Sequence, residues 1–188
     1  MILKNLISNS WTLFLDRDGV INERLVGDYV KHTHDFRLIS GVGEAIKTFS
    51  EIFGRIVVVT NQQGIGRGLM TEEMLNEIHQ KMLQEVKAAG GRIDGIYHCS
   101  GLAEDRPFDR KPNVGMALKA RKEFPEIRFK KSVIAGDSRS DMLFGRRLGM
   151  TTLLIGENHS IAKGNPSLVD YYFPSLIEMA VEIKAVSK

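Results

Sequence analysis

Several features that would decide the class of a protein at once are scarce in this sequence. Cys99 is the single cysteine, so no intramolecular disulfide can form, which fits a reducing compartment. No apolar run approaches the roughly 18 residues that span a membrane. Segment 1–15 carries one lysine, an interrupted apolar pattern and no small-residue cleavage site, which argues against a signal peptide. We therefore expect a cytoplasmic protein without a membrane partner.

A strong charge of one sign is also absent. The chain has 26 lysines and arginines against 23 aspartates and glutamates, so its net charge is +3, and no dense basic run suggests a nucleic-acid surface. No platform of aromatic and basic residues for single-stranded nucleic acid is visible either. Apolar residues make up 43% of the chain, which argues against disorder. The 188 residues favour one domain, 1–188, without a nucleic-acid partner, and leave the oligomeric state open.

Short apolar runs alternate with helical patterns along the whole chain. This alternation favours an α/β fold, a parallel sheet flanked by crossover helices. The runs are nearly continuous in Val, Ile and Leu, as in strands covered on both faces. They predict strands at Trp11–Leu15, Arg55–Thr60, Ile93–Cys99, Ser132–Ala135 and Thr151–Ile155, with a weaker sixth at Tyr171–Phe173. Helices are expected from Glu72 to before Gly90, from the N-cap Asn113 to about Phe124, from near Asp141 to Gly149, and from about Ser175.

The stretch FLDRDGVIN, residues 14–22, places Asp16 and Asp18 at the end of the first apolar run. Two carboxylates this close repel each other, so they need open solvent or a positive charge between them. Taken alone, DRDG is more typical of a turn than of a catalytic centre. The other segments of the chain must decide between these interpretations.

Polar residues follow the other predicted strands in the same way. In open parallel sheets the ligand lies beyond the carboxyl ends of the strands. A hard divalent cation between carboxylates, with a lysine and a hydroxyl facing an anion, describes a phosphoryl site. Each segment alone is a weak signal, and their joint order indicates the site. The residues that meet at this edge are Asp16, Asp18, Thr60, Asn61, Arg110, Lys111, Asp137 and Asp141.

Four motifs resemble the haloacid dehalogenase (HAD) superfamily: FLDRDGVIN, VVVTNQQGIGRG, RKP and GDSRSDM. Within it, the whole chain is similar to the heptose-1,7-bisphosphate 7-phosphatases and the related histidinol-phosphate phosphatases. The resemblance implies a Rossmann-like sheet in which the first and fourth strands are neighbours, so that Asp137 lies beside Asp16.

The resemblance also implies the catalytic roles. Asp16 would be the nucleophile that forms an aspartyl-phosphate, and Asp18 the acid that protonates the leaving oxygen and later activates water. Mg²⁺ would be held by Asp16, the backbone carbonyl of Asp18, and Asp137. The remaining implied roles are substrate binding by Thr60, Asn61 and Arg110, neutralisation of the transferring group by Lys111, and orientation of that lysine by Asp141.

Large HAD caps are inserted after the first motif or between the second and third. Segment 18–60 must hold a loop, a helix and a strand, so we expect no large cap domain and an open site. Its candidate walls are 22–35 and 64–68. Arg67 either meets a substrate anion or is an exposed charge, and the sequence favours neither. His32 and His34 are interpreted as solvated residues rather than a metal site.

One departure from the resembled group concerns zinc. Many of its members carry a zinc loop of Cys-x-His followed by Cys-x-Cys directly before RKP. Here Gly101 stands near the expected histidine, and Pro107 and Asp109 stand where the later cysteines would. Structural zinc normally needs four ligands, and Cys99 alone remains, so we predict no zinc and a small, partly buried strand-end cysteine.

The favoured hypothesis is a Mg²⁺-dependent phosphomonoesterase that removes the 7-phosphate of D-glycero-D-manno-heptose 1,7-bisphosphate. Histidinol phosphate or another small phosphosugar is the alternative substrate. A different class of function is a phosphate-binding module that no longer turns over. Intact Asp16 and Asp18 argue against that class, because a binding module has no need of both.

Overall fold

Six parallel strands form one sheet, and all six lie where the sequence predicts them. The computed structural model describes residues 8–156 and 160–186. The strands are β1 (Thr12–Leu15), β2 (Arg55–Asn61), β3 (Gly95–Cys99), β4 (Ser132–Gly136), β5 (Thr151–Ile155) and β6 (Tyr171–Phe173). Their order is β3-β2-β1-β4-β5-β6. β1 pairs with β2 and β4, with Leu15 in register with Val58 and Ala135, so the segments that follow these three strands leave the same edge of the sheet.

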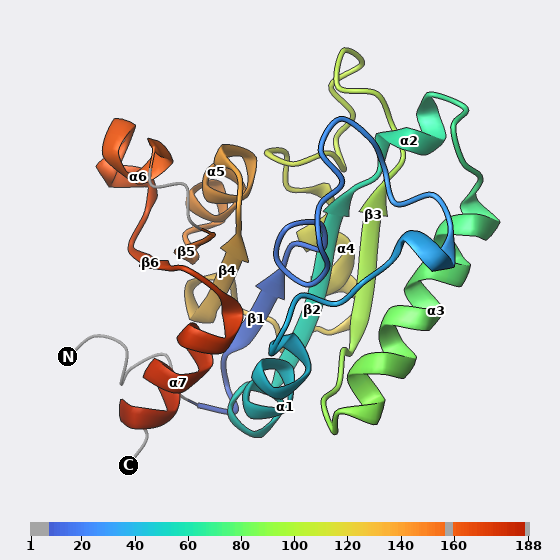
Figure 1. Ribbon diagram of the computed structural model, residues 1–188. Coiled ribbons are helices and arrows are strands. Elements are labelled where there is room, and N and C mark those ends of the chain that lie inside the picture. The colour runs from blue at the N-terminus through green and yellow to red at the C-terminus, as the bar shows by residue number, and fades with distance from the viewer. Residues whose placement is uncertain (1–7, 157–159, 187–188) are drawn as a thin grey trace.

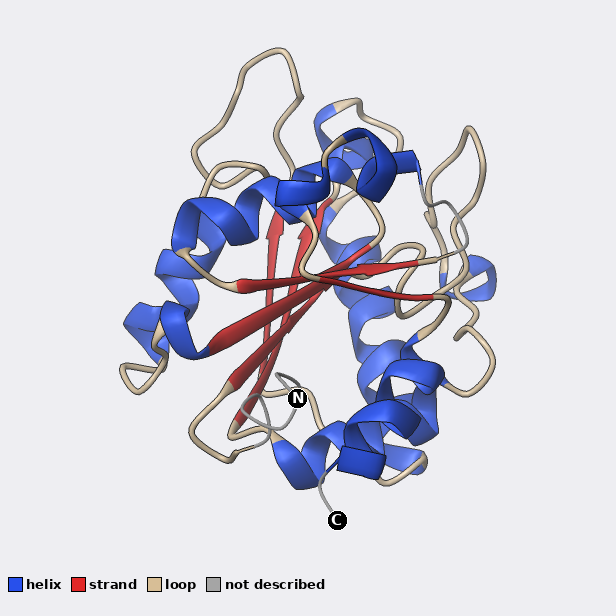
Figure 2. Ribbon diagram, turned by 90° about the vertical axis from the view of Figure 1, so that its left-hand side faces the viewer, coloured by secondary structure: helices blue, strands red, loops and turns tan. Residues whose placement is uncertain are grey.

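Helices cover both faces of this sheet, as Figure 2 shows. Leu13 and Leu15 face one side, where they share a buried cluster with α1 (Val42–Ile52), α3 (Glu72–Ala88) and α7 (Leu176–Val186). Phe14 faces the other, with α4 (Gly115–Glu123) and α5 (Arg139–Leu148). Because successive strand residues point to opposite faces, a strand covered on both sides must be apolar throughout. This explains the unbroken apolar run of β1.

The helix ends follow the predicted signals with one correction, at Asn113. Gly149 has a left-handed backbone and ends α5, as predicted. That helix begins two residues before Asp141, because Asp141 lies inside its first turn and accepts a hydrogen bond from the backbone N–H of Ser138. Asn113 is not the N-cap of α4, which begins at Gly115 after Val114. The Asn113 side chain instead donates to the carbonyl of Pro107, inside the preceding loop.

Loops rather than a domain lie over the carboxyl edge of the sheet. Segment 19–41, between β1 and α1, contains one short 3-10 helix (Thr33–Asp35), and 100–114 connects β3 to α4. Figure 1 shows both loops on the side toward which β1, β2 and β4 point. The described residues contain no separate cap domain. The remaining short helices are α2 (Gln63–Gly66), α6 (Ser160–Gly164), and the 3-10 helices Phe129–Lys131 and Pro166–Leu168.

Part of segment 1–15, where we expect no signal peptide, lies outside the described residues, which begin at residue 8. Across the part that the structure describes, every helix falls short of the length and apolarity that crossing a membrane requires.

Candidate active site

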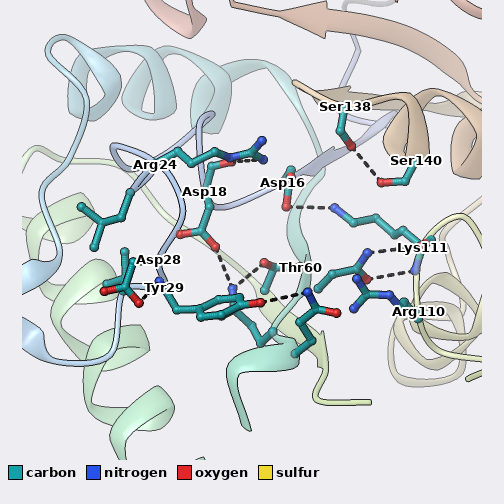
Figure 3. Close-up of a pocket in the computed structure, with 15 residues that line it drawn as sticks. Asp16, Asp18, Arg24, Asp28, Tyr29, Thr60, Arg110, Lys111, Ser138 and Ser140 are labelled. Atoms are coloured by element: carbon teal, nitrogen blue, oxygen red, sulfur yellow. Dashed lines mark hydrogen bonds and ion pairs between the residues drawn. The ribbon is translucent and has the colours of Figure 1, made fainter. Parts of the chain in front are cut away.

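A pocket of about 340 Å³ lies at the carboxyl edge of the sheet, over β1 and β2. Asp16 and Asp18 line its floor, and Thr60 and Lys111 line its side. Figure 3 shows these side chains converging from segments far apart in the sequence. The parallel topology accounts for this convergence, since the residues after neighbouring strands share one edge.

Lys111 is the buried cation of the pocket. Its Nζ lies 2.9 Å from Oδ1 of Asp16 and 2.5 Å from Oδ1 of Asp141, and it donates to the carbonyl of Val59 at 2.7 Å. Burial lowers the pKa of Lys111, but the charges of Asp141 and Asp16 outweigh burial and raise it above its ordinary value. The ammonium group is therefore charged and held by three acceptors, beside the carboxylate expected to react.

Asn61 fixes the backbone of Lys111 to β2. The Asn61 side chain donates to the carbonyl of Lys111 at 3.1 Å and accepts from its backbone N–H at 2.9 Å. Asn61 also lines the pocket, so its predicted contact with substrate stays a prediction beside this positioning contact. Thr60 accepts a hydrogen bond from Gln62 at 2.8 Å and lies on the pocket wall. Gln62 is a site residue that the motif analysis did not single out.

The Asp18 carboxylate is surrounded by donors. Arg17 Nη2 donates to both oxygens of Asp18 at 3.0 Å. The side-chain amides of Asn22 and Gln62 also donate to this carboxylate, at 3.0 and 2.8 Å. Burial raises the pKa of Asp18, but the charge of Arg17 and the hydrogen bonds from Asn22, Arg17 and Gln62 lower it below its ordinary value. Asp18 is thus an ionised carboxylate in the ligand-free protein.

Arg17 itself is fully buried, which sequence reasoning missed. Its Nη1 lies 3.4 Å from Nε2 of His79, a buried residue of α3. Burial and the charge of Arg17 lower the pKa of His79 to about 3, so His79 is neutral and can accept from Arg17. The available signal was a histidine on the otherwise apolar face of a helix. The spacing of residues in the sequence, however, does not indicate that Arg17 is the partner of His79.

Carboxylates crowd the opposite side of the floor. Ligand oxygens of Asp16, Asp137 and Asp141 lie within 4.8 Å of one another. Burial raises the pKa of Asp16 to about 6, with Lys111 opposing and Asp141 adding to the shift. Burial, followed by the charge of Asp16, raises the pKa of Asp137 to about 7. Three carboxylates around one buried lysine leave excess negative charge, which a further cation would offset.

The oxygen atoms available here fit a hard divalent cation. Asp141 is committed to Lys111 and Ser138. The other two carboxylates remain, together with the backbone carbonyl of Asp18. That carbonyl and Oδ1 of Asp137 both accept from Nη2 of Arg24, at 3.0 and 2.9 Å, so they face a common point. These oxygen atoms are the ones that the resemblance implies for Mg²⁺, and their role as metal ligands stays a prediction.

Comparison with known proteins relates the whole chain to phosphatases. The family model for Polynucleotide kinase 3 phosphatase matches residues 13–181. A D-glycero-alpha-D-manno-heptose-1,7-bisphosphate 7-phosphatase from Mycobacterium bovis is 36% identical over 93% of this chain and 92% of its own length. A D-glycero-beta-D-manno-heptose-1,7-bisphosphate 7-phosphatase from Vibrio cholerae is 35% identical over 94% and 97%.

Solved structures extend the likeness to the fold. The D,D-heptose 1,7-bisphosphate phosphatase from B. bronchiseptica, complexed with magnesium and phosphate, has a TM-score of 0.79 at 25% identity, over 93% of this chain and 98% of that one. A HAD-like protein from Mesorhizobium loti has a TM-score of 0.75 at 28% identity, over 96% of this chain and 89% of that one. The chain belongs to the HAD phosphatase family. The resemblance drawn from the four motifs is thereby confirmed.

Two arginines, Arg110 and Arg67, are also expected at the site of this HAD phosphatase. Arg110 lines the pocket, and its Nη1 donates to the carbonyl of Gly101 at 3.3 Å. Arg67 is exposed outside the pocket, with its guanidinium 5.9 Å from the ring of Tyr29. Segment 24–30 forms one wall, as expected, whereas Gln62 and Gln63 supply the wall expected from 64–68.

Side-chain contacts hold the part of the loop 100–114 that precedes Lys111. Pro107 packs so close to Gly101 that a Cβ there would lie 2.6 Å from its ring, and Asp109 pairs with Lys119 at 2.5 Å. Cys99 is buried at the end of β3. Across the described ranges, Asp16, Asp137 and Asp141 form the one group of three or more His, Cys, Asp or Glu residues that could hold a metal ion. The absence of zinc stays a prediction.

Proposed function

We propose that the protein is a Mg²⁺-dependent phosphomonoesterase that removes the 7-phosphate of D-glycero-D-manno-heptose 1,7-bisphosphate through an aspartyl-phosphate on Asp16. The observation that carries the proposal is the buried pair of Asp16 and Lys111 at the floor of a pocket, beside further carboxylates. The names of the Mycobacterium bovis and Vibrio cholerae relatives support the substrate.

In the proposed reaction, an oxygen of Asp16 attacks the phosphorus and the bond from phosphorus to the sugar oxygen breaks. The leaving oxygen takes its proton from Asp18. Water then attacks the phosphorus of the aspartyl-phosphate, Asp18 takes the proton of that water, and Asp16 and inorganic phosphate are released. Lys111 neutralises the transferring group, and Asp141 and Asn61 hold Lys111 in place.

Asp18 must gain a proton for this role, although its pKa is low in the ligand-free protein. The negative charge of a bound phosphate disfavours the carboxylate form of Asp18 and raises its pKa toward the operating pH. Asp16, Asp137 and the backbone carbonyl of Asp18 would hold Mg²⁺, which supplies positive charge that offsets the repulsion between Asp16 and the phosphate when it is bound.

The pocket volume, about 340 Å³, supports a small phosphosugar as the substrate. Thr60, Asn61 and Arg110 line the pocket and are the proposed substrate contacts, whereas Arg67 is retained only as an outer contact with an anion. We further propose a cytoplasmic protein of one domain that binds neither zinc nor nucleic acid. Elemental analysis of protein purified without chelators tests the zinc proposal, since one zinc per chain would contradict it.

The deciding experiment is phosphate release from purified protein, with Mg²⁺ and with EDTA. Substrates are both anomers of the heptose bisphosphate, histidinol phosphate and simpler phosphosugars. We expect metal-dependent release that favours a heptose anomer, and none from Asp16→Asn, because an amide is not a nucleophile of this kind. Weak release spread over the panel would discard the heptose assignment. No release from the wild type would favour a phosphate-binding module, and unchanged turnover in Asp16→Asn would refute its role.

A further inference from the structure

Arg24 lies on the atoms that we assign to the metal. It belongs to segment 19–41, and its Nη2 donates to the carbonyl of Asp18 at 3.0 Å and to Oδ1 of Asp137 at 2.9 Å. Figure 3 shows its side chain reaching across the pocket above Asp18. A guanidinium is a cation, so it provides part of the positive charge that the crowded carboxylates require. Arg24 thus stands where the proposed function needs a divalent ion.

A guanidinium and a metal ion cannot occupy these oxygen atoms together. Two cations at such a separation repel, and each oxygen that coordinates a metal directs its lone pair toward the metal. Asp137 is nearly enclosed, with 15% of its side chain exposed, whereas half of the Arg24 side chain is exposed. The ion pair is therefore one that solvent weakens, and Arg24 can leave it without disturbing the core.

The pocket offers a second place for the displaced charge. Among its lining residues the cations are Arg24, Arg110 and Lys111. Lys111 is engaged by three buried acceptors, whereas Arg110 makes one long hydrogen bond at 3.3 Å. With one phosphate of a bisphosphate at Asp16, the two arginines are the cations left on the rim for the other phosphate.

We propose that Arg24 is an exchangeable cation: it neutralises the metal ligands of the metal-free protein, and on metal binding its guanidinium moves to the second phosphate of the substrate. This inference rests on the proposed function, since it takes a divalent cation and a bisphosphate as the ligands of the site. It makes Arg24 a residue that distinguishes bisphosphate from monophosphate substrates, and it couples metal affinity to segment 19–41.

The first test is the dissociation constant of Mg²⁺, measured by calorimetry on phosphate-free protein. Arg24→Gln should bind Mg²⁺ about fivefold more tightly than the wild type, because no internal cation competes. Arg37→Gln is the matched control: Arg37 is exposed on the same segment, and its loss changes the net charge equally. It should leave the constant unchanged. Arg24→Lys, which keeps the charge, should retain most of the competition.

The second test uses saturating Mg²⁺ and compares the heptose 1,7-bisphosphate with the 7-monophosphate. Arg24→Gln should raise KM for the bisphosphate about tenfold and change KM for the monophosphate less than twofold. Equal Mg²⁺ constants in wild type and Arg24→Gln would overturn the exchange while leaving the proposed function intact. An unchanged bisphosphate KM would overturn the second-phosphate contact. A wild type that binds no Mg²⁺ would refute the proposed function and the exchange together.

Discussion

Asp16 and Asp18 are two residues apart on the same pocket floor, yet their surroundings are opposite. Asp18 accepts from Arg17, Asn22 and Gln62, and its pKa lies below the ordinary value. Asp16 has one cationic partner, Lys111, which it shares with Asp141, and burial raises its pKa to about 6. The chain thus neutralises one carboxylate with its own side chains and leaves the other in a negative cluster.

This difference separates stability from function. Asp18 supplies the counter-charge of the fully buried Arg17, which the fold needs whether or not a ligand is bound. The cluster around Asp16 costs free energy in the ligand-free protein, because buried like charges repel. A cation that binds to the cluster removes this repulsion. The cluster therefore favours cation binding and lowers the stability of the protein without the cation.

The largest expected effect is on the free energy of unfolding after removal of each carboxyl in turn. Asp18→Asn leaves the buried Arg17 without its counter-charge and should destabilise the metal-free protein by about 3 kcal/mol. Asp16→Asn should stabilise it by about 1 kcal/mol at pH 8. The folded pKa of Asp16, about 6, is above its unfolded value, so stability is lost as the pH rises through 6, and an amide cannot ionise.

Urea denaturation with EDTA at pH 8 measures both changes. Asp28→Asn provides the control, since Asp28 is an exposed carboxylate on the pocket rim. Equal destabilisation by Asp16→Asn and Asp18→Asn would remove the contrast. A double-mutant cycle with Arg17→Met should show strong coupling to Asp18, because loss of Asp18 alone leaves the buried Arg17 unpaired, whereas loss of both does not.

His79 supports the Asp18 side of the contrast and should make it sensitive to acid. Its folded pKa, about 3, is below its unfolded value of 6.5, so the unfolded chain binds the extra proton between these values and stability falls as the pH falls below 6.5. From pH 7 to pH 5 this residue should cost about 2 kcal/mol. His79→Gln keeps a neutral acceptor for Arg17 and should remove that part of the loss.

Denaturation midpoints at pH 7 and pH 5 give the difference between wild type and His79→Gln. Other titrating groups contribute equally to both proteins, so the difference isolates His79. A difference that does not change between the two pH values would mean that His79 is protonated in the folded state, and that Arg17 lacks the acceptor we assign to it.

The sequence predicts the Asp16 side of the contrast better than the Asp18 side. Strands rich in Val, Ile and Leu predict a parallel sheet, and a parallel sheet brings the residues after its strands to one edge, so Lys111 and Asp137 could be assigned to the site. Arg17 and His79 meet only through tertiary packing, since His79 lies on α3, 62 residues farther along the chain. No spacing in the sequence encodes that contact, and the burial of Arg17 between two aspartates has no local signal.

Asn61 and Asn113 show a second limit. The sequence predicts a substrate contact for Asn61 and a helix cap for Asn113. The Asn61 side chain lines the pocket and also bonds to Lys111, a contact that the sequence does not predict. The Asn113 side chain bonds to Pro107 and does not cap the helix. A short polar side chain bonds whichever backbone group the fold brings near, and that choice depends on tertiary structure.

Gly19 joins the two regions and gives the smallest expected effect. It follows Asp18 with a φ of +87°, and a Cβ there would lie 2.1 Å from Oδ2 of Asp137. Gly19→Ala should therefore cost about 1 kcal/mol of stability through its backbone and also displace the Asp137 carboxylate.

Gly27→Ala is the control, since Gly27 has a φ of +77° with nothing within 4 Å of its Cβ position. Both variants should lose similar stability, but only Gly19→Ala should weaken Mg²⁺ binding in calorimetry. Equal Mg²⁺ affinities in the two variants would mean that the Asp137 carboxylate can be displaced and still bind the ion. Its position beside Asp16 would then not be essential for Mg²⁺ binding.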